Sequence, residues 1–74
     1  MRRLGEVVRI AAGRVIVRCP DDEVPDLGSD AVNADLAVVG RVVDVFGPTD
    51  RPYVAVTPTR EPTSGLLGQR LYIR

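Results

Sequence analysis

Short runs of valine, interrupted by glycine and proline, dominate this chain and restrict the folds open to it. The 74 residues include thirteen Val against six Leu and three Ile. A β-branched side chain loses χ1 freedom in a helix and packs well on a pleated surface. Seven Gly and six Pro in so short a chain indicate frequent turns. We therefore expect one small all-β domain over residues 1–74.

A first β-hairpin is expected near the N-terminus. Its strands are Leu4–Ala11, which is rich in apolar residues, and Arg14–Cys19, which largely alternates polar and apolar residues. Ala12-Gly13 between them is typical of a tight turn, because Gly adopts positive φ at little cost. Along the second strand, Val15 and Val17 are predicted to share one face.

A polar loop is predicted to follow over Pro20–Asp30, the segment PDDEVPDLGSD. Its acidic trio, Asp21 to Glu23, lacks the spacing of a calcium-binding loop, so we interpret it as solvated. Val24 and Leu27 in the same loop are expected to fold back and cover one end of the core.

A second hairpin is expected in the middle of the chain. Ala31–Phe46 is predicted to be one strand with a bulge or bend at Gly40, since adjacent valines crowd χ1 in a helix and glycine weakens a helix interior by about 1 kcal/mol. Tyr53–Thr57 alternates again and forms the next strand. The connection Gly47–Arg51 has an ordinary length for a hairpin loop.

One or two short strands are expected at the C-terminal end, over Leu66–Arg70 and Leu71–Ile73. The last strand is predicted to pair with the first, because a small sheet with two open edges is prone to aggregate and closure removes both edges. The expected architecture is a single six-stranded antiparallel barrel, closed or nearly closed, of the kind found in translation factors.

The composition excludes most catalytic and metal chemistry. The chain has no His and no Lys, so imidazole catalysis, a His-containing metal site and a Lys-dependent phosphate loop are absent. The single Cys19 forms no internal disulfide, and we interpret it as a small buried residue suited to a reducing cytosol. We expect no catalytic residue, no cofactor, no metal and no small-molecule ligand. We also expect no membrane contact, because no apolar run approaches the ~20 residues that span a bilayer and no export signal follows Met1.

The connection FGPTDRPY carries large rings where a loop tip ordinarily has small polar residues. Phe46 and Tyr53 are two of only three aromatic residues in the chain, and Pro48 and Pro52 lie between them. One interpretation is a self-packed turn with Phe46 under its own loop. The other is a protein-binding patch, since aromatic residues are enriched at interface centres and a proline-stiffened loop loses little entropy on docking.

A stand-alone RNA-binding barrel is a separate alternative. Oligonucleotide-binding barrels place aromatic residues in a positively charged groove. The formal net charge here is zero, which gives no overall attraction to nucleic acid. On this alternative Arg2, Arg3, Arg9 and Arg14 lie together on the first hairpin. A ribosome-maturation barrel module is a further alternative, although its hairpin does not take the Phe-Gly-Pro form.

A recognisable pattern surrounds FGPTDRPY: Gly-x-Val, a short spacer, Phe-Gly-Pro, and Pro-Tyr followed by alternating hydrophobic residues. The matching positions are Gly40, Val42, Val45, Phe46, Gly47, Pro48, Pro52, Tyr53, Val54 and Val56. The chain thereby resembles the archaeal form of the small β-barrel subunit of the H/ACA guide-RNA pseudouridylation ribonucleoprotein, the family named for its glycine- and arginine-rich protein. The opening RRLGEVVRI, the loop VPDLGSDAVN and the ending GLLGQRLYI are also similar to archaeal members.

This resemblance implies a six-stranded barrel that is not an enzyme. The family docks directly on the catalytic domain of the dyskerin-like pseudouridine synthase and influences a mobile loop that holds and releases substrate RNA. Guide RNA and the other H/ACA proteins are then partners only through the complex. Carried over by position, the expected partner-binding residues are Phe46, Gly47, Pro48, Pro52 and Tyr53.

The same resemblance makes Val42, Val45, Val54 and Val56 core positions that hold the hairpin. It also implies a role in rRNA pseudouridylation in the cytoplasm of an archaeal cell. The Arg-Gly-Gly tails of eukaryotic members and the Lys-rich extension of many archaeal members are missing. We therefore expect a minimal core without tail-borne RNA affinity.

Overall fold

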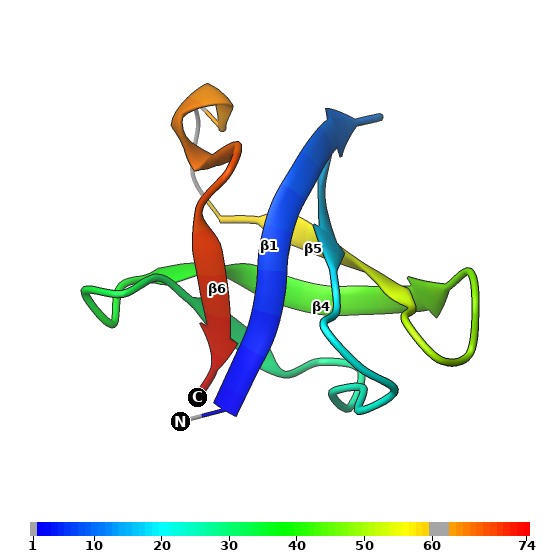
Figure 1. Cartoon of the computed structure of the whole chain (residues 1–74). Helices are drawn as coiled ribbons and strands as arrows, with labels where there is room; N and C mark the ends of the chain where they lie inside the picture. The colour runs from blue at the N-terminus through cyan, green and yellow to red at the C-terminus, as the bar shows by residue number, and fades with distance from the viewer. Residues whose placement is uncertain (1, 60–62) are drawn as a thin grey trace.

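Within the residues that the computed structural model describes, 2–59 and 63–74, six antiparallel strands close into a barrel (Figure 1). The elements are β1 (Arg2–Ala11), β2 (Arg14–Arg18), β3 (Asp30–Val32), β4 (Val38–Phe46), β5 (Tyr53–Pro58), the 3₁₀ helix η1 (Ser64–Leu66) and β6 (Arg70–Ile73). Around the barrel the strand order is β1-β2-β5-β4-β3-β6, and β6 pairs with β1. The predicted all-β class, the closed barrel and the pairing of the last strand with the first are confirmed.

The first hairpin forms as expected because its turn accepts two positive φ angles. Ala12 has a φ of 53° and Gly13 a φ of 75°, the combination that a two-residue type I′ connection requires. β1 ends at Ala11 and β2 begins at Arg14, as predicted to the residue.

The segment predicted as one strand from Ala31 to Phe46 is instead two strands, β3 and β4, joined by a tight turn. Asn33 makes this turn, because its Oδ1 accepts hydrogen bonds from the N–H groups of Asp35 and Ala37 at 2.9 and 3.0 Å. Asn side chains commonly replace ladder pairing with such bonds in turns. The single-strand prediction was wrong because it weighed valine content above this turn chemistry.

Gly40 is needed for close packing of β4 on β5. A Cβ atom at this position would overlap the carbonyl oxygen of Thr57 and would lie 2.8 Å from Cγ1 of Val56. The register of β4 shifts at neighbouring positions, with an extra residue at Val39 against β3 and at Val43 against β5. The bulge predicted at Gly40 therefore lies at the neighbouring residues Val39 and Val43. Gly40 itself allows β4 to approach β5 closely.

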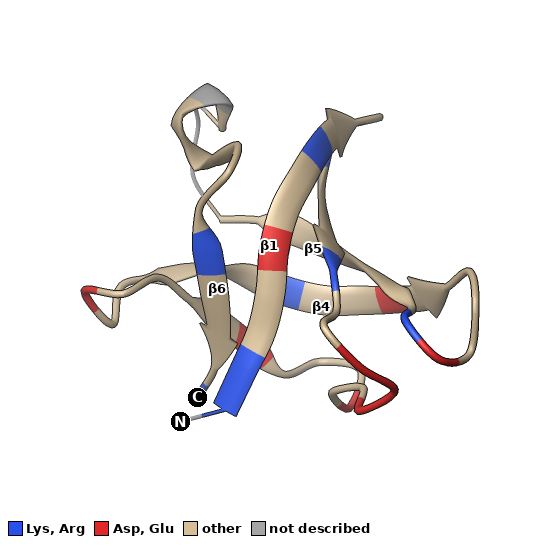
Figure 2. Cartoon of the chain, viewed as in Figure 1, with Lys and Arg blue, Asp and Glu red and all other residues tan. Residues whose placement is uncertain are grey.

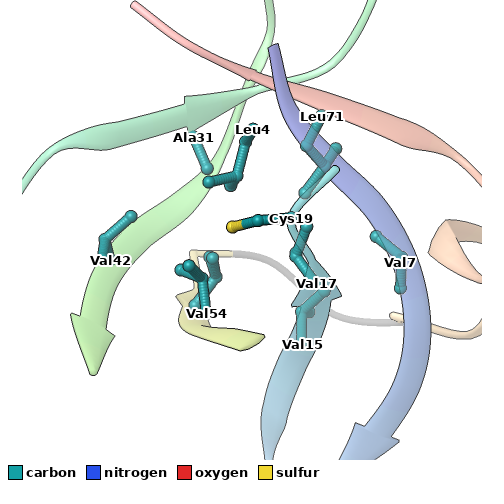
Figure 3. Close-up of a cluster of buried hydrophobic side chains, with 10 residues drawn as sticks. Leu4, Val7, Val15, Val17, Cys19, Ala31, Val42, Val54 and Leu71 are labelled. Carbon is teal, nitrogen blue, oxygen red and sulfur yellow. The ribbon is translucent and has the colours of Figure 1, made fainter. Parts of the chain in front are cut away.

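Small branched side chains from every strand fill the interior of the barrel (Figure 3). The buried set comprises Leu4, Val7, Val15, Val17, Cys19, Ala31, Val32, Val42, Val54, Ala55, Val56 and Leu71. Each buried valine contributes about 1.5–3 kcal/mol relative to exposure. Of the core positions expected around the hairpin, Val42, Val54 and Val56 are buried, and Val45 is partly buried against the cluster.

The loop between β2 and β3 is tied to the barrel through its backbone. The N–H of Gly28 donates to the carbonyl oxygen of Val42 at 2.8 Å, and Pro25 is buried. Val24 and Leu27 are 43% and 65% exposed. The expectation that these two side chains cover one end of the core is therefore wrong, since a proline takes the buried position.

The C-terminal segment forms one strand, β6, after η1 and a turn. The turn is bonded to β1, because the N–H of Gly68 donates to the Val7 carbonyl and the N–H of Val7 donates to the Gln69 carbonyl, both at 2.9 Å. The strand predicted over Leu66–Arg70 is wrong up to Gln69, and β6 begins at Arg70. In the described part of the chain, no helix has the length and apolar character to cross a membrane.

Candidate partner-binding surface

Phe46 and Tyr53 form a stacked pair where the second hairpin leaves the barrel. They are cross-strand partners at the ends of β4 and β5. Their ring centroids are 5.6 Å apart and the ring planes differ by 20°, which is a favourable offset geometry for two aromatic rings. Phe46 is 43% exposed and Tyr53 is partly buried. Phe46 is therefore not tucked under its own loop, but stacks on Tyr53 so that each ring covers one face of the other. The protein-binding patch stays a prediction.

Arg18 fixes the position of Tyr53 from the neighbouring strand. The two residues are cross-strand partners between β2 and β5. The Nη1 of Arg18 donates a hydrogen bond to the Tyr53 hydroxyl at 2.8 Å, and the guanidinium carbon lies 4.9 Å from the ring centroid. A cation over an aromatic ring contributes about 0.5–1 kcal/mol at exposed sites. Tyr53 is thus held by Phe46 through its ring and by Arg18 through its hydroxyl.

The loop that joins the pair places its residues in different environments. Gly47 has a φ of 89°, and a Cβ there would lie 2.9 Å from Cδ2 of Tyr53. Gly47 and Pro48 are exposed. Pro52 is buried, and its carbonyl accepts a hydrogen bond from the N–H of Cys19 at 2.9 Å. Among the five expected partner-binding residues, Pro52 therefore holds the loop against the barrel. The other four are exposed or, in the case of Tyr53, partly buried.

A hollow of about 420 Å³ continues from the aromatic pair across the outer face of the first hairpin. It is lined by Val8, Arg9, Ala11, Ile16, Arg18, Phe46 and Tyr53. The register of β1 against β2 passes from Val7 to Arg9, so Val8 is the extra residue of a bulge and is 44% exposed. Bulges of this kind commonly re-aim a side chain next to a functional site.

Sequence reasoning did not assign four residues to this surface: Val8, Ala11, Ile16 and Arg18. Alternation along β2 places Ile16 and Arg18 on the face opposite the buried valines. This alternation was the sequence signal that could have assigned them to the outer surface. Their position beside Tyr53 depends on the pairing of β2 with β5, and Arg18 and Tyr53 are 35 residues apart in the sequence.

The arginines of the RNA-binding alternative do not form one cluster. Arg2 and Arg3 begin β1, whereas Arg9 lies near its end and Arg14 follows the turn. A strand rises about 3.3 Å per residue, which separates Arg3 from Arg9 by roughly 20 Å. All four side chains are exposed. The RNA-binding alternative requires these four arginines to lie together, and the long strand β1 separates Arg2 and Arg3 from Arg9 and Arg14.

The ionisable side chains of the described residues are dispersed. Within residues 2–59 and 63–74, no three His, Cys, Asp or Glu side chains are placed to hold a metal ion. The acidic trio Asp21 to Glu23 is exposed. Burial, reinforced by the Asp21 carboxylate, raises the pKa of the Cys19 thiol above its ordinary value of 9.0, so Cys19 is held as a neutral core residue. What the surface offers is an ordered aromatic pair, a flanking arginine and an apolar hollow.

Comparison with known proteins agrees with this architecture. Residues 1–74 match the protein family described as the Gar1/Naf1 RNA binding region. An uncharacterised protein of the archaeon Methanothermobacter thermautotrophicus is 33% identical over 78 residues, covering 99% of this chain and 83% of the relative. The resemblance read from the Phe-Gly-Pro hairpin is thereby confirmed, and the chain belongs to the Gar1/Naf1 family.

Proposed function

We propose that this chain is a non-catalytic subunit of the H/ACA guide-RNA pseudouridylation ribonucleoprotein. It docks on the catalytic domain of the dyskerin-like pseudouridine synthase and promotes RNA-guided rRNA pseudouridylation. Membership of a family described by its RNA binding region supports a ribonucleoprotein role. The synthase as the direct partner is inferred from the resemblance of the FGPTDRPY hairpin to that of the H/ACA subunit.

The stacked, half-exposed pair of Phe46 and Tyr53 is the observation that carries the proposal. A standard protein interface takes about 800 Å² from each partner, and the described residues expose 4561 Å² in all. Roughly a sixth of the surface would be covered, enough to include the pair and the hollow beside it. Because Arg18 and Phe46 already hold Tyr53, little side-chain entropy is lost when a partner covers it.

The barrel acts on turnover through the position of the synthase's substrate loop. A docked subunit shifts a loop between two positions only by the difference in its affinity for them. A typical coupling of about 1–3 kcal/mol changes the equilibrium roughly 5- to 150-fold. The barrel contributes no reacting group, and its effect falls on the release of product and therefore on multiple turnover.

Calorimetric titration into the purified synthase without RNA tests the docking step. The wild-type chain should bind one-to-one, and the double variant Phe46→Ala/Tyr53→Ala should lose about 3 kcal/mol or more of binding energy, since central aromatic residues are the usual hot spots. Leu36→Ala/Leu67→Ala is the matched control, because these leucines are also exposed, at 55% and 54%, and lie in the β3–β4 turn and after η1.

A folded aromatic double variant that binds as tightly as the leucine control would show that the hairpin is not the contact. The activity arm compares single and multiple turnover of the assembled particle with each variant. Loss of multiple turnover alone is the expected result for the aromatic variant. Equal loss in both regimes would contradict the assignment to product release.

A further inference from the structure

Four arginines surround a second hollow on the outer face of the barrel, beside the aromatic hairpin. This basic hollow has a volume of about 320 Å³ and is lined by Arg3, Gly5, Glu6, Val8, Arg18, Pro20, Arg51 and Arg70. Its four arginines outnumber its one acidic residue, Glu6, which leaves an excess of three positive charges. The chain as a whole has a formal net charge of zero. Positive charge is therefore concentrated here, while acidic residues gather in the loop after β2 (Figure 2).

Pairing of the strands, not proximity in the sequence, assembles this group. Glu6 on β1 lies opposite Arg70 on β6 and opposite Arg18 on β2. In Figure 2 the blue band on β6 lies level with the red band on β1. Arg3 comes from the start of β1, and Arg51 comes from the loop between β4 and β5. Four separate segments thus contribute one guanidinium group each.

The ion pairs found among residues 2–59 and 63–74 do not involve these four arginines. Those pairs, with N–O distances of 4.0 Å, use Arg2, Arg41 and Arg74. Arg18 donates from Nη1 to the Tyr53 hydroxyl, and its buried Nε has no hydrogen-bond acceptor in the described part of the chain. Within that part, the basic hollow therefore offers more donors and positive charge than the chain itself satisfies.

Arg18 joins the basic hollow to the proposed docking surface. It lines both hollows, together with Val8, and its guanidinium group lies against the ring and the hydroxyl of Tyr53. A partner that covers Tyr53 would therefore also remove water from Arg18. Burial of a charged group is unfavourable unless an opposite charge pairs with it. We therefore expect a partner that binds this surface to present an anionic group at the edge shared by the two hollows.

The lining is better suited to protein carboxylates than to a single strand of nucleic acid. Sites for single strands combine positive charge with aromatic side chains on which the bases stack. Among the described residues no aromatic side chain lines the basic hollow, since Phe46 and Tyr53 line only the neighbouring one. A guanidinium group donates in a planar fork that matches the two oxygens of a carboxylate. The hollow thus supports ionic contacts without base stacking.

We propose that the basic hollow binds an acidic segment of the same protein that docks on the aromatic hairpin. This inference rests on the proposed function, because it assigns the acidic segment to the surface of the synthase. The contact then has two parts. The apolar part, at Phe46 and Tyr53, supplies most of the affinity. The arginines orient the partner and accelerate association, as charges at the edge of an interface commonly do.

Calorimetric titration into the purified synthase without RNA, at low and at high salt, tests the ionic part. The hollow variant is Arg51→Gln/Arg70→Gln. The control, Arg14→Gln/Arg41→Gln, removes the same charge from exposed positions that line neither the basic nor the aromatic hollow. Circular dichroism checks the fold of both variants. The hollow variant should bind about tenfold more weakly than the control at about 50 mM salt and about twofold more weakly at about 500 mM, because salt screens exposed charges.

The absence of Lys from the chain allows the acidic segment to be located directly. Arg70→Lys keeps the positive charge and puts a single side-chain amine at the basic hollow, whereas Arg14→Lys puts one outside it. A carbodiimide activates a carboxylate, and an amine in contact with that carboxylate then forms an amide as the activating group leaves as a urea. In the docked complex, Arg70→Lys should cross-link to Asp or Glu of the synthase and Arg14→Lys should not. Mass spectrometry of the joined peptides reads out both results.

Three results would overturn the proposal and leave docking on the hairpin in place. The first is equal synthase affinity of the hollow variant and the control at both salt concentrations. The second is a docked Arg70→Lys chain that cross-links no more than Arg14→Lys. The third is a hollow variant that keeps synthase affinity but loses affinity of the isolated chain for a labelled single-stranded RNA, which would assign the arginines to nucleic acid. A wild-type chain that does not bind the synthase would instead refute docking itself, so the two failures are distinguishable.

Discussion

The substitution Gly47→Ala isolates the contact that holds the aromatic pair in place. Gly47 has a φ of 89° and Gly28 a φ of 90°, so alanine at either position adopts the same disfavoured φ. At Gly28 an added Cβ meets nothing within 4 Å, whereas at Gly47 it would lie 2.9 Å from Cδ2 of Tyr53. Gly28→Ala is therefore a matched control that carries the backbone cost without the contact.

The free-energy cost of the left-handed φ is the same in both variants, but only Gly47→Ala displaces the Tyr53 ring. An L-residue with a left-handed φ costs about 1–2 kcal/mol, and each kcal/mol lowers the Tm of a domain of this size by about 4–8 °C. Both variants should therefore lose roughly 5–15 °C. In Gly47→Ala the Tyr53 ring has to move by several tenths of an ångström. This weakens its stacking on Phe46, which is worth about 0.5–1.5 kcal/mol, and its hydrogen bond to Arg18.

Thermal unfolding by far-UV circular dichroism, the near-UV tyrosine signal and calorimetric titration into the synthase give the three measurements. The near-UV signal should change in Gly47→Ala alone. Docking should weaken about tenfold in Gly47→Ala, equivalent to about 1.4 kcal/mol, and by less than about twofold in Gly28→Ala. If the two variants have equal Tm, equal near-UV signal and equal affinity, the Tyr53 contact neither orders the hairpin nor supports docking.

Three further predictions test the barrel itself. Gly40→Ala should lower the Tm by about 10–20 °C, because overpacking costs about 1–3 kcal/mol, whereas Gly65→Ala, which meets nothing within 4 Å, should leave it unchanged or slightly higher; equal values would refute the steric argument. Ala12→Asn should raise the Tm by a few degrees, since Asn accepts the φ of 53° more readily than Ala. The folded chain holds the Cys19 proton more tightly than the unfolded chain, so the free energy of unfolding should fall as pH rises above about 9; urea titrations should show a smaller fall in Cys19→Ala.

The architecture follows from local patterns that a sequence displays openly. Valine alternation, the Ala12-Gly13 turn and the need to cover sheet edges together predicted a closed barrel. The main error lay at Asn33, where one side chain accepts two backbone N–H groups and folds a run of apolar residues into a hairpin. Such a turn competes with strand extension by only a small free energy. Residue types alone do not decide between them.

Part of the candidate site could likewise be predicted from the sequence, and part could not. Phe46 and Tyr53 were predictable because they are conspicuous in a loop and because hairpin pairing sets them opposite each other. Arg18 was not, since it reaches Tyr53 only through the pairing of β2 with β5. A second hollow, whose lining includes Arg3, Arg18, Arg51 and Arg70, takes these residues from four segments and was likewise hidden. Its members gather only once the closure of β6 on β1 is known.

Closure of the barrel also determines how any partner can bind it. Within residues 2–59 and 63–74 the strand order returns from β6 to β1, so every strand has a neighbouring strand on both sides. This leaves only short unpaired stretches for an extended peptide to join. Backbone hydrogen bonding is thereby limited as a source of affinity, and we expect side chains on the outer face to supply most of it. A core of small valines leaves the few large side chains for that face. This is why a pair of rings on a stiff hairpin, fixed by one arginine, should carry most of the docking energy.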